Sequence, residues 1–166
     1  MEDALVTGVA LDRNQIKVTI RDVPDKPGMA ADVFDMLGKA NVNVDMIIQS
    51  AARGQSNDIS FTVPKDDHES AIKALETVQR RLKTGSIEHT VNVAKVSVVG
   101  VGMRSHSGVA GKMFRCLADN SVNIQMIATS EIKISCIVDK ADGERAVKFL
   151  HKAFGLEKKQ RGYAAR

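Results

Sequence analysis

The chain has 166 residues, 43% of them hydrophobic and 27% charged, a composition typical of one or two small globular domains and unlike that of a disordered polymer. The net charge of +4 comes from scattered basic residues, and only 4% of the residues are aromatic, which disfavours nucleic-acid binding because few rings are available to stack on bases. No segment approaches the roughly 18 to 20 consecutive apolar residues of a membrane span, and the acidic N-terminus lacks the pattern of a signal peptide.

In chain order, the same elements occur twice. Residues 28–50 (GMAADVFDMLGKANVNVDMIIQS) align without a gap with residues 108–130 (GVAGKMFRCLADNSVNIQMIATS). After a loop that is shorter in the second copy, residues 59–63 match residues 134–138. Similar segments at a fixed spacing are the signature of a repeated structural unit, so the sequence predicts two domains of one fold. The identical positions in the ungapped segment are Gly28/Gly108, Ala30/Ala110, Phe34/Phe114, Leu37/Leu117, Val42/Val122, Asn43/Asn123, Met46/Met126, Ile47/Ile127 and Ser50/Ser130.

The first copy begins with a β-branched run at residues 16–20, which predicts a strand. Apolar residues at 30, 33, 34 and 37 have the spacing of one helix face, and the runs 42–49 and 58–63 read as extended. A second helix is marked by apolar residues at 71, 72, 75, 78 and 82, with Asp66 and Glu69 spaced for a capping arrangement at its start. Residues 87–93 predict a fourth strand.

The second copy repeats this order, with strands expected at 96–101, 122–129 and 133–138 and with Asp142 expected to cap its last helix. Its C-terminal residues after Leu156 are poor strand formers, so we expect the N-terminal run 5–11 to cross over and supply the fourth strand. The expected fold class is α+β, two tandem ferredoxin-like βαββαβ domains with antiparallel sheets and helices on one face. The expected domains are residues 15–93 and residues 94–166, the latter completed by residues 1–14. Domains this small bury thin cores, so we expect them to pack together or to dimerise.

Catalytic signatures are missing from the sequence. It contains no phosphate-binding loop, no dinucleotide fingerprint, no HExxH and no GxSxG. His68, His89 and His151 are expected on element surfaces without clustered partners, whereas His106 either forms the wall of a small-ligand pocket or is an exposed turn residue. Cys116 and Cys136 lack a CxxC spacing and are expected to be buried free thiols in a reducing cytoplasm, so neither a metal nor a cofactor is expected.

A glycine follows each predicted first strand and precedes the helix, in the turns 25–28 (DKPG) and 105–108 (SHSG). A helix N-terminus suits a carboxylate, and a residue without a side chain lets a ligand approach the backbone. Asp25 offers a carboxylate for the ammonium group of an amino acid. The alternative is that both glycines only make tight turns. The repeated Asn43 and Asn123 are open to two interpretations as well, a ligand contact or the end of a turn before a strand.

The DKPG turn, the helix and the segment NVNVDMIIQS resemble an ACT domain. Residues 95–103 (KVSVVGVGM), 105–108 (SHSG) and 129–135 (TSEIKIS) resemble more narrowly the regulatory region of aspartate kinases. The resemblance implies a chain without catalytic machinery that senses threonine, lysine or both for feedback inhibition of an ATP:aspartate phosphotransferase. It implies as partners a second copy of the chain, paired through the ACT domains, and the catalytic (alpha) subunit of an aspartate kinase. An ACT-type regulatory subunit of another amino-acid biosynthetic enzyme and a ferredoxin-like nucleic-acid-binding module are the alternatives.

The resemblance also implies two effector sites at interfaces between chains, where the first domain of one subunit faces the second domain of another. Charge suggests lysine for the second site, because Asp45 and Glu131 can pair its ε-ammonium, and threonine for the first. Ser107 replaces a proline that is frequent before the glycine in this family. The first site would contain Asp25, Lys26, Pro27, Gly28, Met29, Ala30 and Gln49, closed by Asn123, Ile124 and Gln125. The second site would contain Met103, Ser105, His106, Gly108, Val109, Ala110, Ser130 and Glu131, closed by Asn43, Val44 and Asp45.

Overall fold

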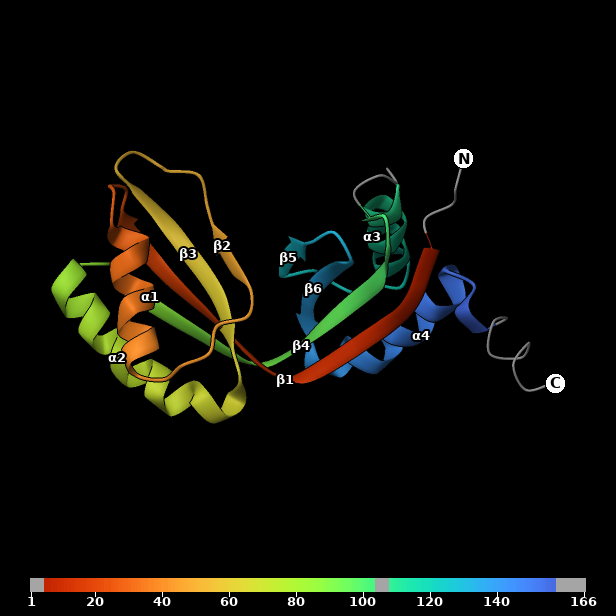
Figure 1. Cartoon of the computed structure of the whole chain (residues 1–166), viewed down its shortest axis with the longest axis horizontal. Coiled ribbons are helices and arrows are strands. Elements are labelled where there is room, and N and C mark those ends of the chain that lie inside the picture. The colour runs from red at the N-terminus through yellow and green to blue at the C-terminus, as the bar shows by residue number, and fades with distance from the viewer. Residues whose placement is uncertain (1–4, 104–107, 158–166) are drawn as a thin grey trace. The chain divides into compact units, whose positions relative to one another are not determined.

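In the computed structural model, which describes residues 5–103 and 108–157, the chain forms two compact units (Figure 1). One unit comprises residues 14–91, and the other comprises the described residues up to 13 and from 92 onward. The chain is α+β, and β1 (Leu5–Pro24) and β4 (Ile87–Val101) contribute to both units.

The unit of residues 14–91 contains α1 (Met29–Lys39), β2 (Ile47–Gln49), β3 (Ser56–Val63), the short 3₁₀ turn η1 (Lys65–Asp67) and α2 (His68–Leu82). The strand order is β2-β3-β1-β4, with β3 antiparallel to both β1 and β2. Helices α1 and α2 lie on one face of this sheet and pack against each other (Figure 1). The β1–β3 register is interrupted by a bulge between Ile20 and Val23, next to Asp22 with its φ of 51°.

The other unit contains α3 (Val109–Asp119), β5 (Met126–Thr129), β6 (Lys133–Asp139), the 3₁₀ turn η3 (Lys140–Asp142) and α4 (Gly143–Ala153). Its strand order is β1-β4-β6-β5, with β6 antiparallel to both β4 and β5. Helix α3 packs against α4. The same sequence periodicity therefore produces the same order of elements in both units, as the fold-class prediction required.

Each core is built where the sheet-facing residues of the strands meet the apolar stripes of the helices. In the unit of residues 14–91, Leu37 and Leu75 are buried against Val18 and Phe61. The ring of Phe34 meets that of Phe61 edge-on at 5.5 Å. In the second unit the core gathers the corresponding side chains, including Leu117, Cys136 and Leu150. Burying each large apolar side chain contributes about 1.5–3 kcal/mol, so these stripes hold the helices on the sheets.

The N-terminal part of β1 belongs to the second unit's core. Val6 is buried there at 5% exposure, and the Thr7 hydroxyl donates to the carbonyl of Val99 on β4 over 3.3 Å. Leu11 lies so close to Gly143 that a Cβ built on the glycine would be 3.0 Å from its Cδ1. Arg13 forms an ion pair with Glu144 on α4. A hydrogen bond to β4, apolar packing and an ion pair with α4 therefore hold residues 5–13 in this unit.

Two expectations about strands are corrected. Residues 5–24 form one continuous strand where two separate runs were expected. Residues 42–46 and 122–125, which were expected to be extended strand, lie outside the strands. The reason is that a left-handed residue follows each preceding helix, Asn41 (φ 56°) after α1 and Ser121 (φ 57°) after α3. The next N–H reaches back to the helix, Val42 to Leu37 and Val122 to Leu117, which is the Schellman pattern.

The expected capping arrangement of Asp66 and Glu69 is wrong. The residue before α2 is Asp67, and no side chain caps the helix. The Asp67 carboxylate instead accepts a hydrogen bond from the backbone N–H of Asn43 over 3.0 Å. Asp142 does occupy the position before α4, but its carboxylate pairs with Arg145 at 2.7 Å and makes no cap hydrogen bond. Both carboxylates therefore serve tertiary or side-chain contacts.

Candidate functional site

The glycines that end the two strand-to-helix turns share a left-handed backbone conformation. Gly28 precedes α1 with φ 92°, Gly108 precedes α3 with φ 107°, and neither helix has a side-chain cap. A Cβ built on either glycine would meet nothing within 4 Å. Glycine is therefore needed for the left-handed backbone and not because of crowding by other described residues.

Asp25 is exposed and is held in place by Gln55, just before β3, and by Asn57 within it. Its backbone N–H donates to the carbonyl of Gln55 over 2.8 Å, and Asn57 Nδ2 donates to its Oδ1 over 2.9 Å. Asn57 is only 5% exposed, and its own Oδ1 is buried without a hydrogen-bond partner. The sequence analysis did not identify Asn57 as a site residue. Its presence near the start of a strand, where asparagine is disfavoured, could have indicated a special role.

Gln49 lies at the same end of β3 as Asp25. It ends β2, is exposed and pairs with Ile59, while the neighbouring Ser50 hydroxyl accepts the N–H of Asp58 over 2.9 Å. The structure thus places Asp25, Gly28 and Gln49 around the start of one strand. Lys26 and Pro27 are exposed in the turn, whereas Met29 is buried at 6% exposure and Ala30 is half-buried.

An ion-pair network lies beside this turn. Arg21 pairs with Asp58 at 2.8 Å and with Glu88 at 2.9 Å. The pKa of Asp58 is lowered by the hydrogen bond from the N–H of Asp22 and then by Arg21, and the pKa of Glu88 is lowered by its hydrogen bonds from Arg21. The pKa of Arg21 is raised by the same contacts. All three groups stay charged near neutral pH, and in the second copy the positions matching Arg21 and Asp58 are Val99 and Lys133.

The second turn is described only in part. Ser105 and His106, together with Ser107, lie outside the described residues. Met103 and Val109 are each 8% exposed and belong to the core of their unit, while Gly108 is exposed and Ala110 is half-buried. The side chains of Met103 and Val109 therefore serve packing, and among the described residues of this turn the backbone of Gly108 is accessible.

Ser130 and Glu131 occupy the hairpin between β5 and β6. The Ser130 hydroxyl accepts the N–H of Lys133 over 3.2 Å, the counterpart of the Ser50 contact in the first copy. Both serines therefore have a structural role in closing a hairpin. Glu131 is exposed at the tip, and the carbonyl of Ile132 accepts the N–H of Gly100 on β4 over 2.8 Å. The hairpin tip thus lies beside the strand that leads to Met103.

The segments 43–45 and 123–125 follow the helix ends and precede β2 and β5. Asn43 and Asn123 are exposed and lie outside the strands, which favours the turn interpretation of their backbone and leaves their side chains accessible. Val44 and Ile124 are half-buried, and Asp45 donates its backbone N–H to the carbonyl of Thr62. Gln125 Nε2 donates to Asp139 Oδ1 over 2.8 Å, so its amide is already engaged.

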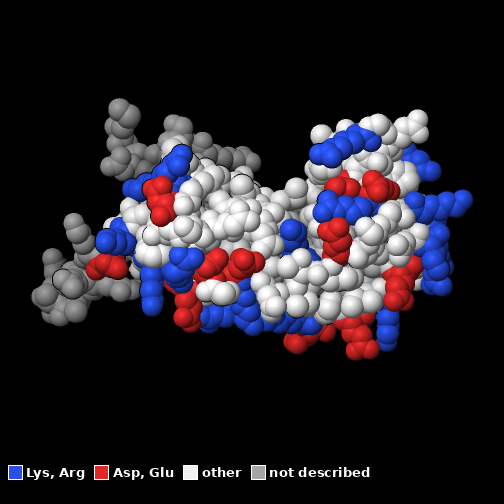
Figure 2. All heavy atoms as spheres, turned by 180° about the vertical axis from the view of Figure 1, so that it is seen from behind, with Lys and Arg blue, Asp and Glu red and all other residues white. Residues whose placement is uncertain are grey.

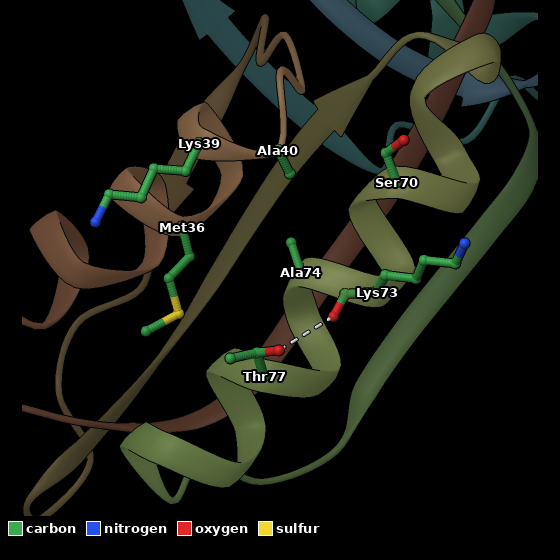
Figure 3. A pocket seen from close by; sticks show the side chains of 7 residues that line it. All are labelled: Met36, Lys39, Ala40, Ser70, Lys73, Ala74 and Thr77. Atoms are coloured by element: carbon green, nitrogen blue, oxygen red, sulfur yellow. Dashed lines mark hydrogen bonds between the residues drawn. The ribbon is translucent and has the colours of Figure 1, made fainter.

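Two surface hollows were found outside the turns. The first, of about 450 Å³, lies between α1 and α2, and none of the expected site residues lines it. Figure 3 shows Met36 and Ala74 projecting between the helices, whereas the Lys39 and Lys73 side chains extend away from each other. The second, of about 460 Å³, is lined by Asn123 and Ile124 together with Gly111, Phe114, Arg115, Ala118 and Val122. Only this second hollow adjoins residues expected to close a site.

The described residues hold few other reactive groups. Cys136 is buried, which raises its pKa to about 12, and burial followed by the charge of Asp119 raises the pKa of Cys116. Within residues 5–103 and 108–157, no three His, Cys, Asp or Glu side chains gather to hold a metal ion, and no helix there is long and apolar enough to cross a membrane. Basic and acidic side chains are interspersed on the face shown in Figure 2.

One expectation about the histidines is wrong. His68 and His89 do not lie apart, because their rings meet edge-on at 5.3 Å between the start of α2 and β4. Desolvation lowers the pKa of His89, and the charge of His68 lowers it further. A helix and a strand that are distant in sequence bring the two rings together, so the spacing along the chain held no sign of the pair.

Comparison with known proteins identifies the family of the chain. The sequence profile of the ACT domain matches residues 15–79 and 96–154. The chain is 45% identical over 157 residues to an aspartate kinase of Stutzerimonas stutzeri, covering 95% of this chain but only 38% of that enzyme. The chain therefore spans well under half the length of such relatives.

Solved structures of regulatory subunits match over nearly their whole length. A structure of aspartokinase alpha and beta subunits superposes with a TM-score of 0.85 at 48% identity, covering 91% of this chain and 99% of the matched one. The ligand-free regulatory subunit of aspartate kinase from Thermus thermophilus gives 0.86 at 42% identity, covering 90% and 98%. Aspartokinase III of E. coli, solved with lysine and aspartate, gives 0.69 at 25% identity, covering 91% and 33%. The chain belongs to the ACT domain family, and its two copies form a regulatory region of the aspartokinase type.

Proposed function

We propose that this chain is an amino-acid sensor that regulates an aspartate kinase by feedback, binding threonine, lysine or both. The observation that carries the proposal is the repeated helix start, in which an exposed left-handed glycine precedes a helix without a side-chain cap. Such a helix end favours the α-carboxylate of an amino acid, because unpaired N–H groups and the positive end of the helix dipole point toward it.

The first site is proposed to take threonine. The carboxylate of Asp25, oriented by Asn57, would accept a hydrogen bond from the α-ammonium group of threonine. The backbone from Lys26 to Ala30 would surround the α-carboxylate of the ligand. Gln49 lies at the same end of the sheet and has the polarity to contact a hydroxyl. The segment Asn123–Gln125 of a second chain would close this site.

The second site is proposed to take lysine. The backbone around Gly108 would receive the carboxylate, and Glu131 at the exposed hairpin tip would attract the ε-ammonium together with Asp45 from the closing segment 43–45 of a second chain. Ser130 would shape the site through the hairpin that its hydroxyl closes. Ser105, His106, Ala110 and the packing residues Met103 and Val109 complete the proposed set.

The proposed partners are a second copy of this chain, paired through the ACT domains, and an aspartate kinase catalytic (alpha) subunit. The similarity to a structure that contains alpha and beta subunits supports the second partner. The domains are proposed to be residues 15–93 and 94–166, with residues 1–14 completing the second. A coupling free energy of roughly 1–3 kcal/mol between effector binding and the arrangement of the dimer would suffice for feedback control.

Calorimetric titration with threonine and with lysine tests the proposal. Asp25→Asn should weaken threonine binding about ten- to a hundredfold, because a charge-assisted hydrogen bond is lost, and leave lysine binding unchanged. Asp45→Ala should weaken lysine binding and leave threonine binding unchanged. Glu76→Gln, on the exposed face of α2, is the control and should change neither. Absence of heat with both amino acids, for the chain alone and for the chain mixed with an aspartate kinase catalytic subunit, would refute the proposal.

A further inference from the structure

The segment between α1 and β2, which is proposed to close the second effector site, is held at both of its ends. The Asp67 carboxylate at the start of α2 accepts the N–H of Asn43 over 3.0 Å. On β3, the carbonyl of Thr62 accepts the N–H of Asp45 and its hydroxyl accepts the N–H of Met46, each over 3.1 Å. The backbone of this closing segment is therefore fixed by hydrogen bonds to elements of its own unit.

The second copy does not repeat the Asp67 contact. The matching residue, Asp142, pairs with Arg145 at 2.7 Å, and Arg145 Nη1 donates to the carbonyl of Asn120 over 2.5 Å. The residue that matches Arg145 in the first copy is Ser70, which offers the Asp67 carboxylate no cation. The Asp67 contact is therefore particular to the first copy and does not follow from the shared fold.

The hydroxyl of Thr62 is particular to the first copy as well. Its counterpart in the second copy is Ile137, and both side chains are fully buried. A buried hydroxyl costs free energy unless it is hydrogen-bonded, and the N–H that Thr62 accepts meets this requirement. The second copy adds a different anchor, because Gln125 Nε2 donates to Asp139 Oδ1 over 2.8 Å. Side-chain acceptors thus hold the backbone of the first closing segment, whereas the second uses the side chain at the position that matches Asp45.

We infer that Asp67 is a positioning residue of the proposed lysine site. By holding the N–H of Asn43, and together with Thr62, it presets the backbone that carries Asp45, the proposed partner of the ε-ammonium group. The inference rests on the proposed function and adds to it residues that set the affinity of one site. A segment that is ordered before the ligand arrives loses less conformational freedom on binding. Removing the anchor therefore lowers the affinity for lysine without removing a group that contacts it.

Calorimetric titration of the full chain with L-lysine tests the inference. Asp67→Ala should weaken lysine binding about tenfold, because the ordering of the closing segment is then left to the ligand. Asp67→Asn keeps a side-chain oxygen that can accept the N–H of Asn43, so it should restore most of the affinity. Threonine binding should be unchanged in both variants, since the segment proposed to close the threonine site, residues 123–125, has no hydrogen bond with Asp67 among the described residues.

Asp66→Ala is the matched control. It removes an exposed carboxylate one residue earlier and causes the same loss of negative charge near the N-terminus of α2. Lysine binding should be unchanged in this variant, because no contact within the described chain joins Asp66 to the closing segment. If Asp67→Ala fails to fold, Thr62→Val provides a second test, since it removes the other side-chain acceptor and should also weaken lysine binding while sparing threonine binding.

Hydrogen exchange of the Asn43 amide in the ligand-free chain reports on the anchor directly. Exchange should be faster in Asp67→Ala than in the parent chain, and Asp67→Asn and Asp66→Ala should exchange like the parent. A parent chain that binds lysine no more tightly than Asp67→Ala does would overturn the inference and leave the proposed function standing. Equal weakening by Asp66→Ala, or no rescue by Asp67→Asn, would overturn it too. A parent chain that binds neither amino acid, alone or with the catalytic subunit, would refute the proposed function and with it this role of Asp67, even where exchange shows that the contact forms.

Discussion

At the scale of single residues, Gly28 shows how one backbone conformation can decide both stability and accessibility. Its φ of 92° is strained for any residue with a Cβ, although a Cβ would meet nothing within 4 Å. Gly28→Ala should therefore lower the free energy of unfolding by about 1–2 kcal/mol through strain alone, measured by urea denaturation. Gly8→Ala, in β1 with equally open surroundings but no positive φ, should instead be neutral or stabilising. Equal losses in both variants would contradict backbone strain at Gly28 as the cause.

Hydrogen-bonded hydroxyl pairs between strands, one of them fully buried, are a second determinant at this scale. Ser97 and Ser135 share a hydrogen bond of 2.7 Å between β4 and β6, and Thr19 and Ser60 share one of 2.8 Å at the matching place in the first copy. Ser97→Ala leaves the Ser135 hydroxyl buried without its partner, so it should cost about 1–3 kcal/mol by urea denaturation. The double change Ser97→Ala with Ser135→Ala should cost less than the sum of the single changes. Additive costs would mean that water replaces the missing partner.

At the scale of elements, the contact between the start of α2 and β4 predicts a pH dependence. The pKa of His89 is lowered in the folded state by desolvation and by His68, so the unfolded state binds a proton more readily. Stability should therefore be fully present above the unfolded pKa of about 6.5 and fall as the pH decreases below it. His89→Gln should flatten the dependence of the urea midpoint between pH 7 and 5, while the loss below pH 4, due to Asp58 and Glu88 with their lowered pKa values, remains. An unchanged slope above pH 5 would contradict this assignment.

The elements also show what periodicity along the chain can reveal. Both helices of each copy and the central strands were predictable, because their apolar spacing reflects which residues face the core. The segments 42–46 and 122–125 were not, since apolar residues alternate there with polar ones while the Schellman hydrogen bonds to Leu37 and Leu117 hold the backbone out of the sheet. The capping prediction failed because the Asp67 carboxylate is used by the backbone N–H of Asn43, a partner 24 residues away.

The candidate site was predictable to a similar extent. The repeated glycines are visible as residue types at a fixed place in each copy. The role of Asn57 is not, because it depends on β1 and β3 lying side by side, which places its amide against Asp25. The same reason hid the pairing of His68 with His89. Contacts between distant segments are set by topology, and residue spacing alone does not contain them.

At the scale of the whole molecule, the two units differ in how they use the N-terminus. Residues 5–13 add a strand and buried side chains such as Val6 to the unit that begins again at residue 92. Deleting residues 1–12 should therefore expose the backbone of β4 from residue 93 onward and raise its hydrogen-exchange rates, while β3 in the unit of residues 14–91 keeps its protection. Greater loss of protection in β3 than in β4 after the N-terminal deletion would refute this division of roles.

The continuous β1 has a consequence for synthesis in the cell. Its first nine described residues leave the ribosome before the rest of their unit, and the part of β4 that belongs to that unit begins at residue 92, nearly ninety residues later. At about 5–20 residues per second, this apolar edge would wait roughly 4–17 s for its partner, even after the unit of residues 14–91 has all of its own sequence. An unpaired strand edge is a template for pairing with other chains. The nascent chain should thus pass through a period of aggregation risk that ends only when the second copy has emerged, so growth conditions that slow elongation should lower the yield of folded protein.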